Sequence, residues 1–291
     1  MNKRTLALLA VLVSGILGSA VAGITKKALG EIPPYSFTFL RFAVAAICIL
    51  PFFFYSNGHK ISKMRELTPI SLFATINVIF FIVGVKYTTA NVGSVIYAAV
   101  PLLCAVILYF LFKERLSRKK ELGLFVGFVG VLFITLLPVL EKGNPFAGNI
   151  IGNLLLTTAI ISWSFYMVYS KKLHDTYSPF LIIANFIFVS VVATFPLALL
   201  DLQTNFGWWN HVGPWGIFAV LYVAIVVTII NYMINQYAIK HGGAVFAGMM
   251  FYVSPIFGFV ANYFIVGEQL TSGFIFGSLL ALVGTYLVVR K

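Results

Sequence analysis

The sequence predicts an all-α integral membrane protein whose ten transmembrane helices form two inverted five-helix repeats. The membrane class follows from composition, because 60% of the residues are hydrophobic and only 10% are charged. Uncharged apolar runs of about 20 residues recur along the chain, which is the length that crosses roughly 30 Å of hydrocarbon. The repeats follow from an internal duplication of the sequence.

The duplication is visible as residues that recur at one constant offset. The matched pairs are Asn77/Asn231, Lys86/Lys240, Ala90/Ala244, Pro101/Pro255, Tyr109/Tyr263, Glu114/Glu268, Leu116/Leu270 and Gly130/Gly284. The earlier parts of the halves align at a shorter offset, so the second half has gained residues, which we place in the Trp-rich connection 201–214. We therefore expect a first five-helix repeat over residues 1–140 and a second over residues 148–291.

Ten spans are expected, separated by short connections that carry Gly, Pro, Asn or charge. They are 5–24, 36–55, 67–86, 92–112, 121–139, 150–170, 178–200, 214–238, 244–265 and 271–289. The first follows Lys3 and Arg4 and so imitates a signal peptide, but its counterpart in the second half favours an uncleaved span. The connection 201–214 holds Trp208 and Trp209, which suit a membrane interface.

The distribution of Lys and Arg predicts the orientation. Most of the 20 basic residues fall in connections on the same side as the N-terminus, so both termini are expected in the cytoplasm of a multi-pass protein of the cytoplasmic (inner) membrane. With five spans in each repeat, the second repeat must be inverted relative to the first.

Several function classes are disfavoured. The excess of 20 Lys and Arg over 8 Asp and Glu lies in short loops, with no basic groove that would indicate a nucleic-acid partner. No span holds a convergent His, Asp and Glu set, a P-loop or a zinc-ligand spacing, so we expect no enzyme activity, metal or cofactor. Cys48 and Cys104 lie in apolar runs and are expected to pack as small hydrophobes.

Polar side chains inside the spans are the candidate binding residues. An Asn in hydrocarbon needs hydrogen-bond partners and should face the bundle interior. Helical stripes of such residues either line a polar cavity or join helices by hydrogen bonds. The candidate substrate-binding residues are Asn77, Tyr97, Trp163, Tyr166, Asn231, Tyr232, Asn235, Gln236 and Tyr252.

Pro101 and Pro255 are expected to act as hinges or kinks, because proline cannot donate the helical backbone hydrogen bond. Arg41 is the charged residue well inside a span. It either pairs with an anionic substrate group or, as we favour, reaches the interface or pairs with helix-end carbonyls. No carboxylate lies mid-span, so the cavity is expected to be uncharged. Glu114 and Glu268 are expected on opposite faces, each accepting N–H groups from the helix that follows it.

Small-xxx-small pairs, Gly123/Gly127 and Gly273/Gly277, occur in the fifth and tenth spans. They could seat a homodimer interface, or they could pack against the fourth or ninth span, which we favour.

The segment Lys113-Glu114-Arg115-Leu116 with Gly127 and Gly130, the stretch Ile160-Ser162-Trp163, and Ala238-Ile239-Lys240 before Ala244 resemble the EamA-type drug/metabolite transporters. The resemblance covers essentially the whole chain. It implies a carrier whose central cavity is lined by the first, third, fourth, sixth, eighth and ninth spans. The expected function is alternating-access export of small organic metabolites, amino acids or related compounds foremost, across a lipid bilayer. The alternative is a polyspecific efflux carrier for drugs or lipophilic cations.

Overall fold

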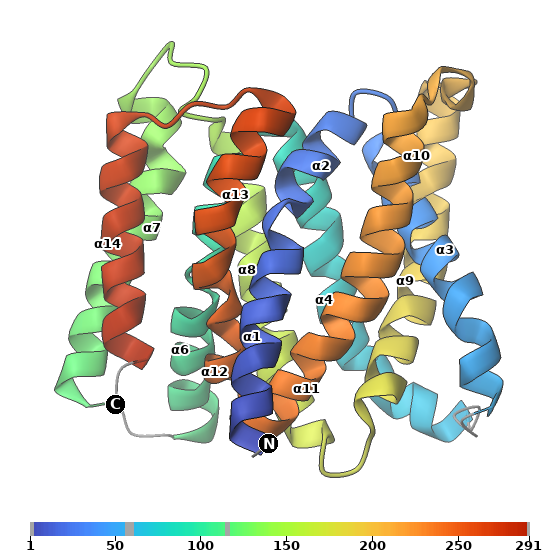
Figure 1. The fold of residues 1–291 in the computed structure, drawn as a ribbon, viewed down its shortest axis with the longest axis horizontal. Helices are drawn as coiled ribbons and strands as arrows, with labels where there is room; N and C mark the ends of the chain where they lie inside the picture. The colour runs from blue at the N-terminus through green and yellow to red at the C-terminus, as the bar shows by residue number, and fades with distance from the viewer. Residues whose placement is uncertain (1–2, 56–60, 114–116, 290–291) are drawn as a thin grey trace.

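A computed structural model describes residues 3–55, 61–113 and 117–289, and every regular element in those ranges is a helix. Figure 1 shows the helices side by side, with both termini at one end of the bundle. The α2–α3, α7–α8, α9–α10 and α13–α14 connections lie at the opposite end. The first half holds α1 (Lys3–Ser19), α2 (Val21–Ala28), α3 (Pro34–Tyr55), α4 (Ile61–Tyr87), α5 (Ala90–Tyr97), α6 (Val100–Phe112) and α7 (Arg118–Leu140). The second half holds α8 (Ile150–Leu173), α9 (Pro179–Thr204), η1 (Trp208–His211), α10 (Pro214–Leu221), η2 (Tyr222–Asn231), α11 (Tyr232–Gly242), α12 (Ala244–Gly248), α13 (Met250–Val266) and α14 (Ser272–Val289).

Eight helical segments among the described residues are long and apolar enough to cross a membrane. They are Thr5–Ala28, Pro34–Tyr55, Lys63–Tyr87, Ala90–Phe112, Ile150–Leu173, Pro179–Thr204, Pro214–Gly242 and Ala244–Val266. Two shorter apolar helices, Phe125–Leu140 and Ser272–Gly284, lie where the fifth and tenth spans are predicted. The chain is therefore a multi-pass helical membrane protein, as its composition indicates.

Several predicted spans are interrupted rather than continuous. The first span breaks at Ala20 and the fourth at Ala98 and Ala99. Pro101 follows that second break as one of the first residues of α6, where its missing N–H costs no helical hydrogen bond. In the ninth span the break lies at Met249, and α13 continues through Pro255.

The eighth span changes its helical pitch midway. Residues Tyr222–Asn231 form a π-helix between α10 and α11. The Thr228 hydroxyl donates to the Val223 carbonyl at 2.8 Å, a reach of five residues that matches the wider turn. Such wide turns are rare and are found disproportionately at functional sites.

Helices α7 and α14 approach very closely at one edge of the bundle. A Cβ atom added at Gly284 would overlap the backbone of Gly127, and one added at Gly130 would overlap the backbone of Ala281. A Cβ at Gly127 would also meet Leu102 of α6 at 3.2 Å, as expected for packing on the fourth span, whereas those at Gly273 and Gly277 would meet residues of the α7 end instead of the ninth span. The fifth and tenth spans pack mainly against each other, because both offer small residues. This face is occupied within the chain.

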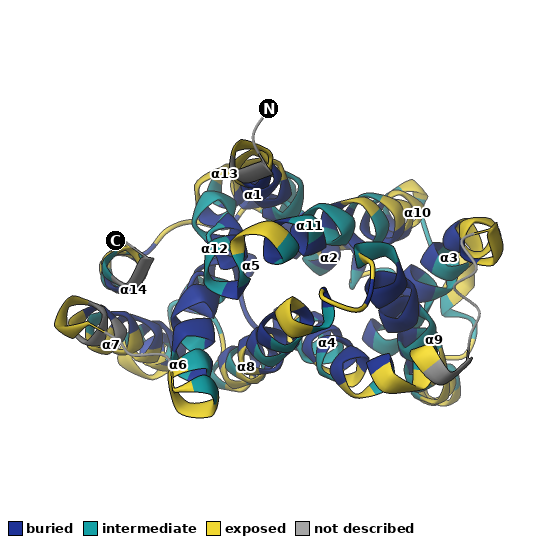
Figure 2. Ribbon diagram, turned by 90° about the horizontal axis from the view of Figure 1, so that it is seen from below, coloured by how far each residue is buried: buried dark blue, intermediate teal, exposed yellow. Residues whose placement is uncertain are grey.

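The remaining helices surround the centre of the molecule. Helix α3 packs on α9, α4 on α8, and α1 on both α11 and α13. Figure 2 shows buried residues facing inward and exposed residues on the outer sides of the bundle. The exposed outer residues include large apolar side chains such as Phe52, Phe110 and Phe264, as expected where helices face lipid.

Candidate functional site: a central polar cavity

A cavity at the centre of the bundle holds about 680 Å³ of empty space, counting the part open to the outside. Helices α1, α2, α3, α4, α5, α8, η2, α11 and α13 contribute its walls. The lining residues are Ser14, Gly15, Gly18, Ser19, Val21, Ala22, Arg41, Asn77, Val78, Phe81, Gly93, Ser94, Tyr97, Trp163, Val227, Asn231, Tyr232, Met250, Phe251 and Ser254. All six spans that the family resemblance implies are represented, and α3 adds a seventh through Arg41.

Asn231 stands at the end of the π-helix and faces the first span. Its side-chain oxygen accepts a hydrogen bond from the Ser14 hydroxyl, and both residues are buried. The amide nitrogen of Asn231 lies beside Gly18, where a Cβ would meet it at 3.4 Å. The small Gly18 thus leaves this N–H₂ group at the cavity wall, where it can donate to a ligand.

Asn77 on α4 is held on the opposite wall by its two donors. Its amide nitrogen donates to the Tyr97 hydroxyl and, at 2.8 Å, to the Ala159 carbonyl of α8. These two bonds fix the orientation of the amide, so the carbonyl oxygen remains as an acceptor at the cavity wall. Asn77 and Asn231 therefore offer opposite polarities to the cavity, although they occupy equivalent positions in the duplicated sequence.

Arg41 is buried, with 1% of its surface exposed. Its Nε donates to the Thr228 hydroxyl at 2.7 Å and one Nη donates to the Tyr232 hydroxyl at 2.8 Å. No carboxylate is paired with it among the residues that the structure describes. The expectation that Arg41 reaches the membrane interface is wrong, because two hydroxyls from the eighth span hold it inward. The cavity is consequently not uncharged.

An aromatic wall lies next to the guanidinium. The Tyr232 ring has its centroid 5.5 Å from Cζ of Arg41 and 5.2 Å from the ring of Trp163. Trp163 in turn contacts Tyr166, with centroids 4.9 Å apart. The indole Nε1 of Trp163 is buried and has no hydrogen-bond partner among the described residues. An unpaired buried donor is costly, so this one points to a group that the cavity receives.

The structure brings together the candidates Asn77, Tyr97, Trp163, Asn231 and Tyr232 at the cavity. It places Asn235, Tyr252, Tyr166 and Gln236 outside the lining. As substrate-binding residues these four stay a prediction, as do Pro101 and Pro255 as hinges. Asn235 donates to the sulfur of Met250 at 2.9 Å, and the Tyr252 hydroxyl is buried without a partner in the described chain.

Tyr166 and Gln236 belong to a hydrogen-bonded group nearer the end of the bundle that holds the termini. The Gln236 amide nitrogen donates to the hydroxyls of Tyr166 and Ser170 at 2.7 and 3.3 Å. Its carbonyl faces Nε2 of His174 at 2.8 Å, so that ring nitrogen must carry the proton. Burial lowers the pKa of His174 below its usual value, which favours the neutral ring.

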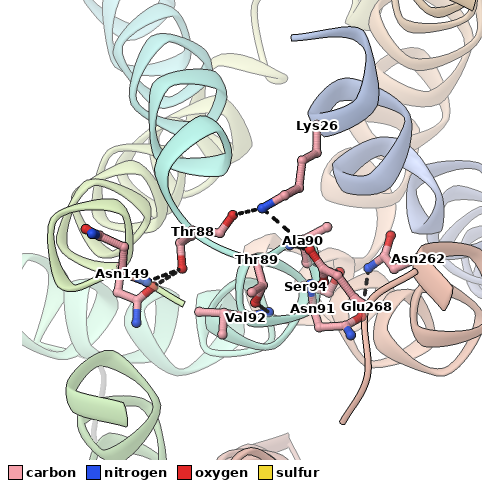
Figure 3. A network of polar contacts seen from close by, with 11 residues as sticks. Lys26, Thr88, Thr89, Ala90, Asn91, Val92, Ser94, Asn149, Asn262 and Glu268 are labelled. Atoms are coloured by element: carbon pink, nitrogen blue, oxygen red, sulfur yellow. Dashed lines mark hydrogen bonds and ion pairs between the residues drawn. The ribbon is translucent and has the colours of Figure 1, made fainter. Parts of the chain in front are cut away.

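The opposite end of the cavity is tied together by Glu268 (Figure 3). Its carboxylate accepts from the backbone N–H groups of Ala90 at 2.7 Å and Asn91 at 2.8 Å, and lies 3.6 Å from Nζ of Lys26. Lys26 also donates to the Thr88 carbonyl. The expectation that Glu268 caps the helix that follows it is wrong, because it caps α5 of the first half. Its counterpart Glu114 lies outside the described residues.

Among the described side chains, no group of three or more His, Cys, Asp and Glu could hold a metal ion. What the cavity offers is a guanidinium, amide and indole donors, one amide acceptor and aromatic faces, which are groups that bind small molecules. Sequence reasoning missed Ser14 and Met250 and misjudged Arg41. A lone serine or methionine in an apolar span does not indicate a binding residue, whereas a charged residue such as Arg41 inside a span does.

A multi-pass helical bundle around a central cavity with a few polar groups is typical of membrane transport proteins, and comparison with known proteins supplies the family. The EamA-like transporter family matches residues 5–136 and 150–290, so the chain belongs to this family within the drug/metabolite transporter superfamily.

Relatives from a bacterium, an archaeon and a plant match most of the chain. The uncharacterized transporter YyaM of Bacillus subtilis is 26% identical over 92% of this chain and 88% of its own length. An uncharacterized transporter of Archaeoglobus fulgidus is 25% identical over 100% of this chain and 99% of its own. A chloroplastic WAT1-related protein of Arabidopsis thaliana is 24% identical over 90% of this chain and 64% of its own. One solved structure with 18% identity covers 96% of this chain and 95% of its own, with a TM-score of 0.65, and shares the fold.

Proposed function

We propose that the protein is a secondary transporter that moves small organic metabolites, amino acids or related compounds, by alternating access through the central cavity. The observation that carries the proposal is the pairing of donors and an acceptor across that cavity. The carboxylate of an amino acid requires donors, which Arg41, Trp163 and Asn231 supply. Its ammonium requires an acceptor, which the carbonyl oxygen of Asn77 supplies.

The alternative, efflux of lipophilic cations, has less support. The described lining residues include Arg41 but no Asp or Glu. A cation entering the cavity would meet the same charge without a carboxylate to neutralise it.

The inverted arrangement of two five-helix repeats, divided at residues 1–140 and 148–291, belongs to the same proposal. The packing of the central spans supports it, because their larger contacts have counterparts when the halves are exchanged. Helix α4 packs on α8 as the π-helix and α11 pack on α1, and α5 and α6 pack on α8 as α13 packs on α1. Alternating access in such proteins is a rocking of repeats around a fixed site.

We place the protein in the cytoplasmic membrane with both termini inside and with export as the direction of net transport. The two ends of the bundle differ in charge, and Lys3, Arg4, Lys171, Lys172 and Lys240 are on the side of the termini. A fusion of a periplasm-sensitive reporter to the C-terminus checks the orientation. Reporter activity from the C-terminal fusion contradicts it.

Flux into proteoliposomes tests the transport proposal. A panel of amino acids, sugars and organic cations is presented with and without a pH gradient, and we expect uptake of one or more amino acids above empty liposomes. Flux of organic cations alone contradicts the proposal. Because the described cavity lining contains no carboxylate, uptake should not depend on the pH gradient.

A variant pair separates binding from packing. Asn231→Ala should reduce flux per reconstituted molecule, since it removes the amide that lines the cavity. Asn185→Ala is the matched control, because Asn185 is equally buried but bonds to Ser71 and Met64 between α4 and α9. Equal loss of flux per molecule in both variants assigns Asn231 to packing instead.

A further inference from the structure

We infer that the cavity is an anion site, with Arg41 and the indole N–H of Trp163 as its donors, and that the transported compounds carry a carboxylate. This inference rests on the proposed transport function and narrows its substrate class. It begins from Arg41, a charged residue that has only 1% of its surface exposed.

A buried guanidinium demands compensation. Burying an ion costs several kcal/mol unless an opposite charge or a full set of hydrogen bonds replaces the lost water. The two hydroxyls of Thr228 and Tyr232 satisfy Nε and one Nη. Both are neutral, and the other Nη has no hydrogen bond among the described residues. Two aromatic rings, Phe42 and Tyr232, lie 5.4 and 5.5 Å from Cζ. The protein has thus oriented the guanidinium and left part of its donor edge without a partner, and its charge without a carboxylate, among the described residues.

The second observation is independent of the first. Trp163 is 2% exposed, lines the same cavity, and has a buried Nε1 donor without a partner in the described chain. Indole N–H groups usually find an acceptor when buried. Trp163 and Arg41 both lie against the Tyr232 ring, at 5.2 Å between centroids and 5.5 Å from Cζ to centroid respectively. The two unmatched donors therefore flank one side chain.

A carboxylate answers both demands. Its two oxygens accept from the guanidinium, whose planar donor geometry suits carboxylates, and a remaining lone pair reaches the indole N–H. A neutral amide offers one acceptor oxygen and adds donors where donors already converge. An ammonium has no acceptor for either group. The geometry therefore selects anionic groups over both.

The test compares ligands that carry a carboxylate with ligands that do not. The probes are leucine, leucinamide, 4-methylpentanoate and 3-methylbutylamine, which keep the same branched chain. The first readout is competition with whichever compound the flux panel shows to be transported. We expect leucine and 4-methylpentanoate to compete roughly 10- to 100-fold more strongly than leucinamide and the amine, the range expected for a charge-assisted hydrogen bond. Equal competition by acid and amide overturns the inference.

Arg41→Gln should abolish the preference for acids over amides while leaving competition by the amide nearly unchanged. Arg41→Lys keeps the charge but loses the planar pair of donors, so it should keep the preference with weaker binding. If Arg41→Gln does not fold, the Lys variant and Trp163→Phe still decide the matter. A variant at Arg41 that folds and keeps the full acid preference contradicts the proposal.

Trp163→Phe removes the N–H donor but keeps an aromatic ring against Tyr232. Binding of the acids should weaken about two- to tenfold, as expected for a single neutral donor. Trp215→Phe is the matched control, because Trp215 also has a buried and unpartnered Nε1 among the described residues but does not line the cavity. If both variants bind the acids as tightly as the parent does, or if both lose the same amount of affinity, Trp163 is not a donor to the ligand.

A second readout does not require transport. A ligand that binds the folded protein raises its thermal unfolding temperature, so the same four probes are added to the purified full chain in detergent. Stabilisation by the acids alone that is lost in Arg41→Gln supports the anion site. If no compound in the panel is transported at the same time, the transport proposal fails and the anion site stands. If sugars or amines are transported while the acids neither compete nor stabilise the protein, the protein is still a transporter and the anion site is overturned.

Discussion

Replacing Glu268 by Gln tests how strongly its carboxylate holds together the helices at one end of the cavity. Glu268 is 6% exposed, and each of its carboxylate oxygens has its own backbone donor, Ala90 on Oε1 and Asn91 on Oε2. A glutamine keeps one acceptor oxygen and turns its N–H₂ group toward the other backbone N–H. Lys26 at the same time loses its ion-pair partner, which lies 3.6 Å from Nζ. One helix-capping bond and one ion pair are therefore lost together.

The size of the effect follows from these contacts. Loss of a charge-assisted hydrogen bond costs about 1.5–3 kcal/mol, and a partly exposed ion pair adds up to about 1 kcal/mol. We expect the free energy of unfolding to fall by about 2–4 kcal/mol in Glu268→Gln. The same change should favour opening of the bundle at this end, because the carboxylate joins α5 to the α13–α14 connection and to α2.

Glu31 offers a matched control. Its carboxylate also accepts two backbone N–H groups at a helix start, but Gly213 and Gly216 both donate to the same oxygen, each at 2.9 Å. A glutamine carbonyl can keep both bonds, so Glu31→Gln loses only the favourable charge at the start of α10, about 0.3–1 kcal/mol.

Unfolding by sodium dodecyl sulfate in mixed micelles, followed by circular dichroism, measures both variants against the parent. Equal destabilisation by Glu268→Gln and Glu31→Gln would refute the reasoning, because the two carboxylates differ in how their oxygens are used. A Glu268→Gln protein as stable as the parent would show that water replaces the lost contacts without cost.

Two further predictions use the same unfolding measurement. Gly284→Ala should destabilise by about 1–3 kcal/mol, because its Cβ overlaps the Gly127 backbone. Gly93→Ala should be neutral or slightly stabilising, since its Cβ meets Leu156 at an ordinary 3.5 Å. The second concerns His174, because burial lowers the pKa of its imidazole in the folded protein. Below the unfolded value of about 6.5 the unfolded chain binds the proton more readily, so stability should fall as the pH drops.

Controls accompany both. If Gly93→Ala destabilises as much as Gly284→Ala, the loss reflects helix geometry rather than the close approach of α7 and α14. For the pH effect, His174→Gln should flatten the dependence of the unfolding midpoint between neutral pH and pH 5, relative to the parent. An unchanged slope would assign the effect to other groups.

The helical membrane class was predictable because apolar length and composition are dictated by the bilayer. Buried Asn77 and Asn231 were predictable as inward-facing, because an amide in hydrocarbon must find partners. The sequence could not show which of the polar stripes on the helices reaches the cavity. Tyr166 and Gln236 have the same helical spacing and polarity as the lining residues, yet they hydrogen-bond to each other. Arg41 was misplaced because its side-chain direction depends on Thr228, whose position is set by a π-helical turn that no sequence pattern signals.

The interruptions are distributed unevenly around the cavity. Helices α4 and α8, which carry Asn77 and Trp163, are continuous, whereas the first, fourth, eighth and ninth spans change pitch or break within or next to the segments that line it. The cavity wall thus combines two continuous helices with four interrupted spans, of which the fourth span packs on α8. A ligand of different bulk can be accommodated by yielding of the broken helices, while the donor of Trp163 stays fixed. We therefore expect a carrier that is lenient about the size of what it moves and strict about its charge.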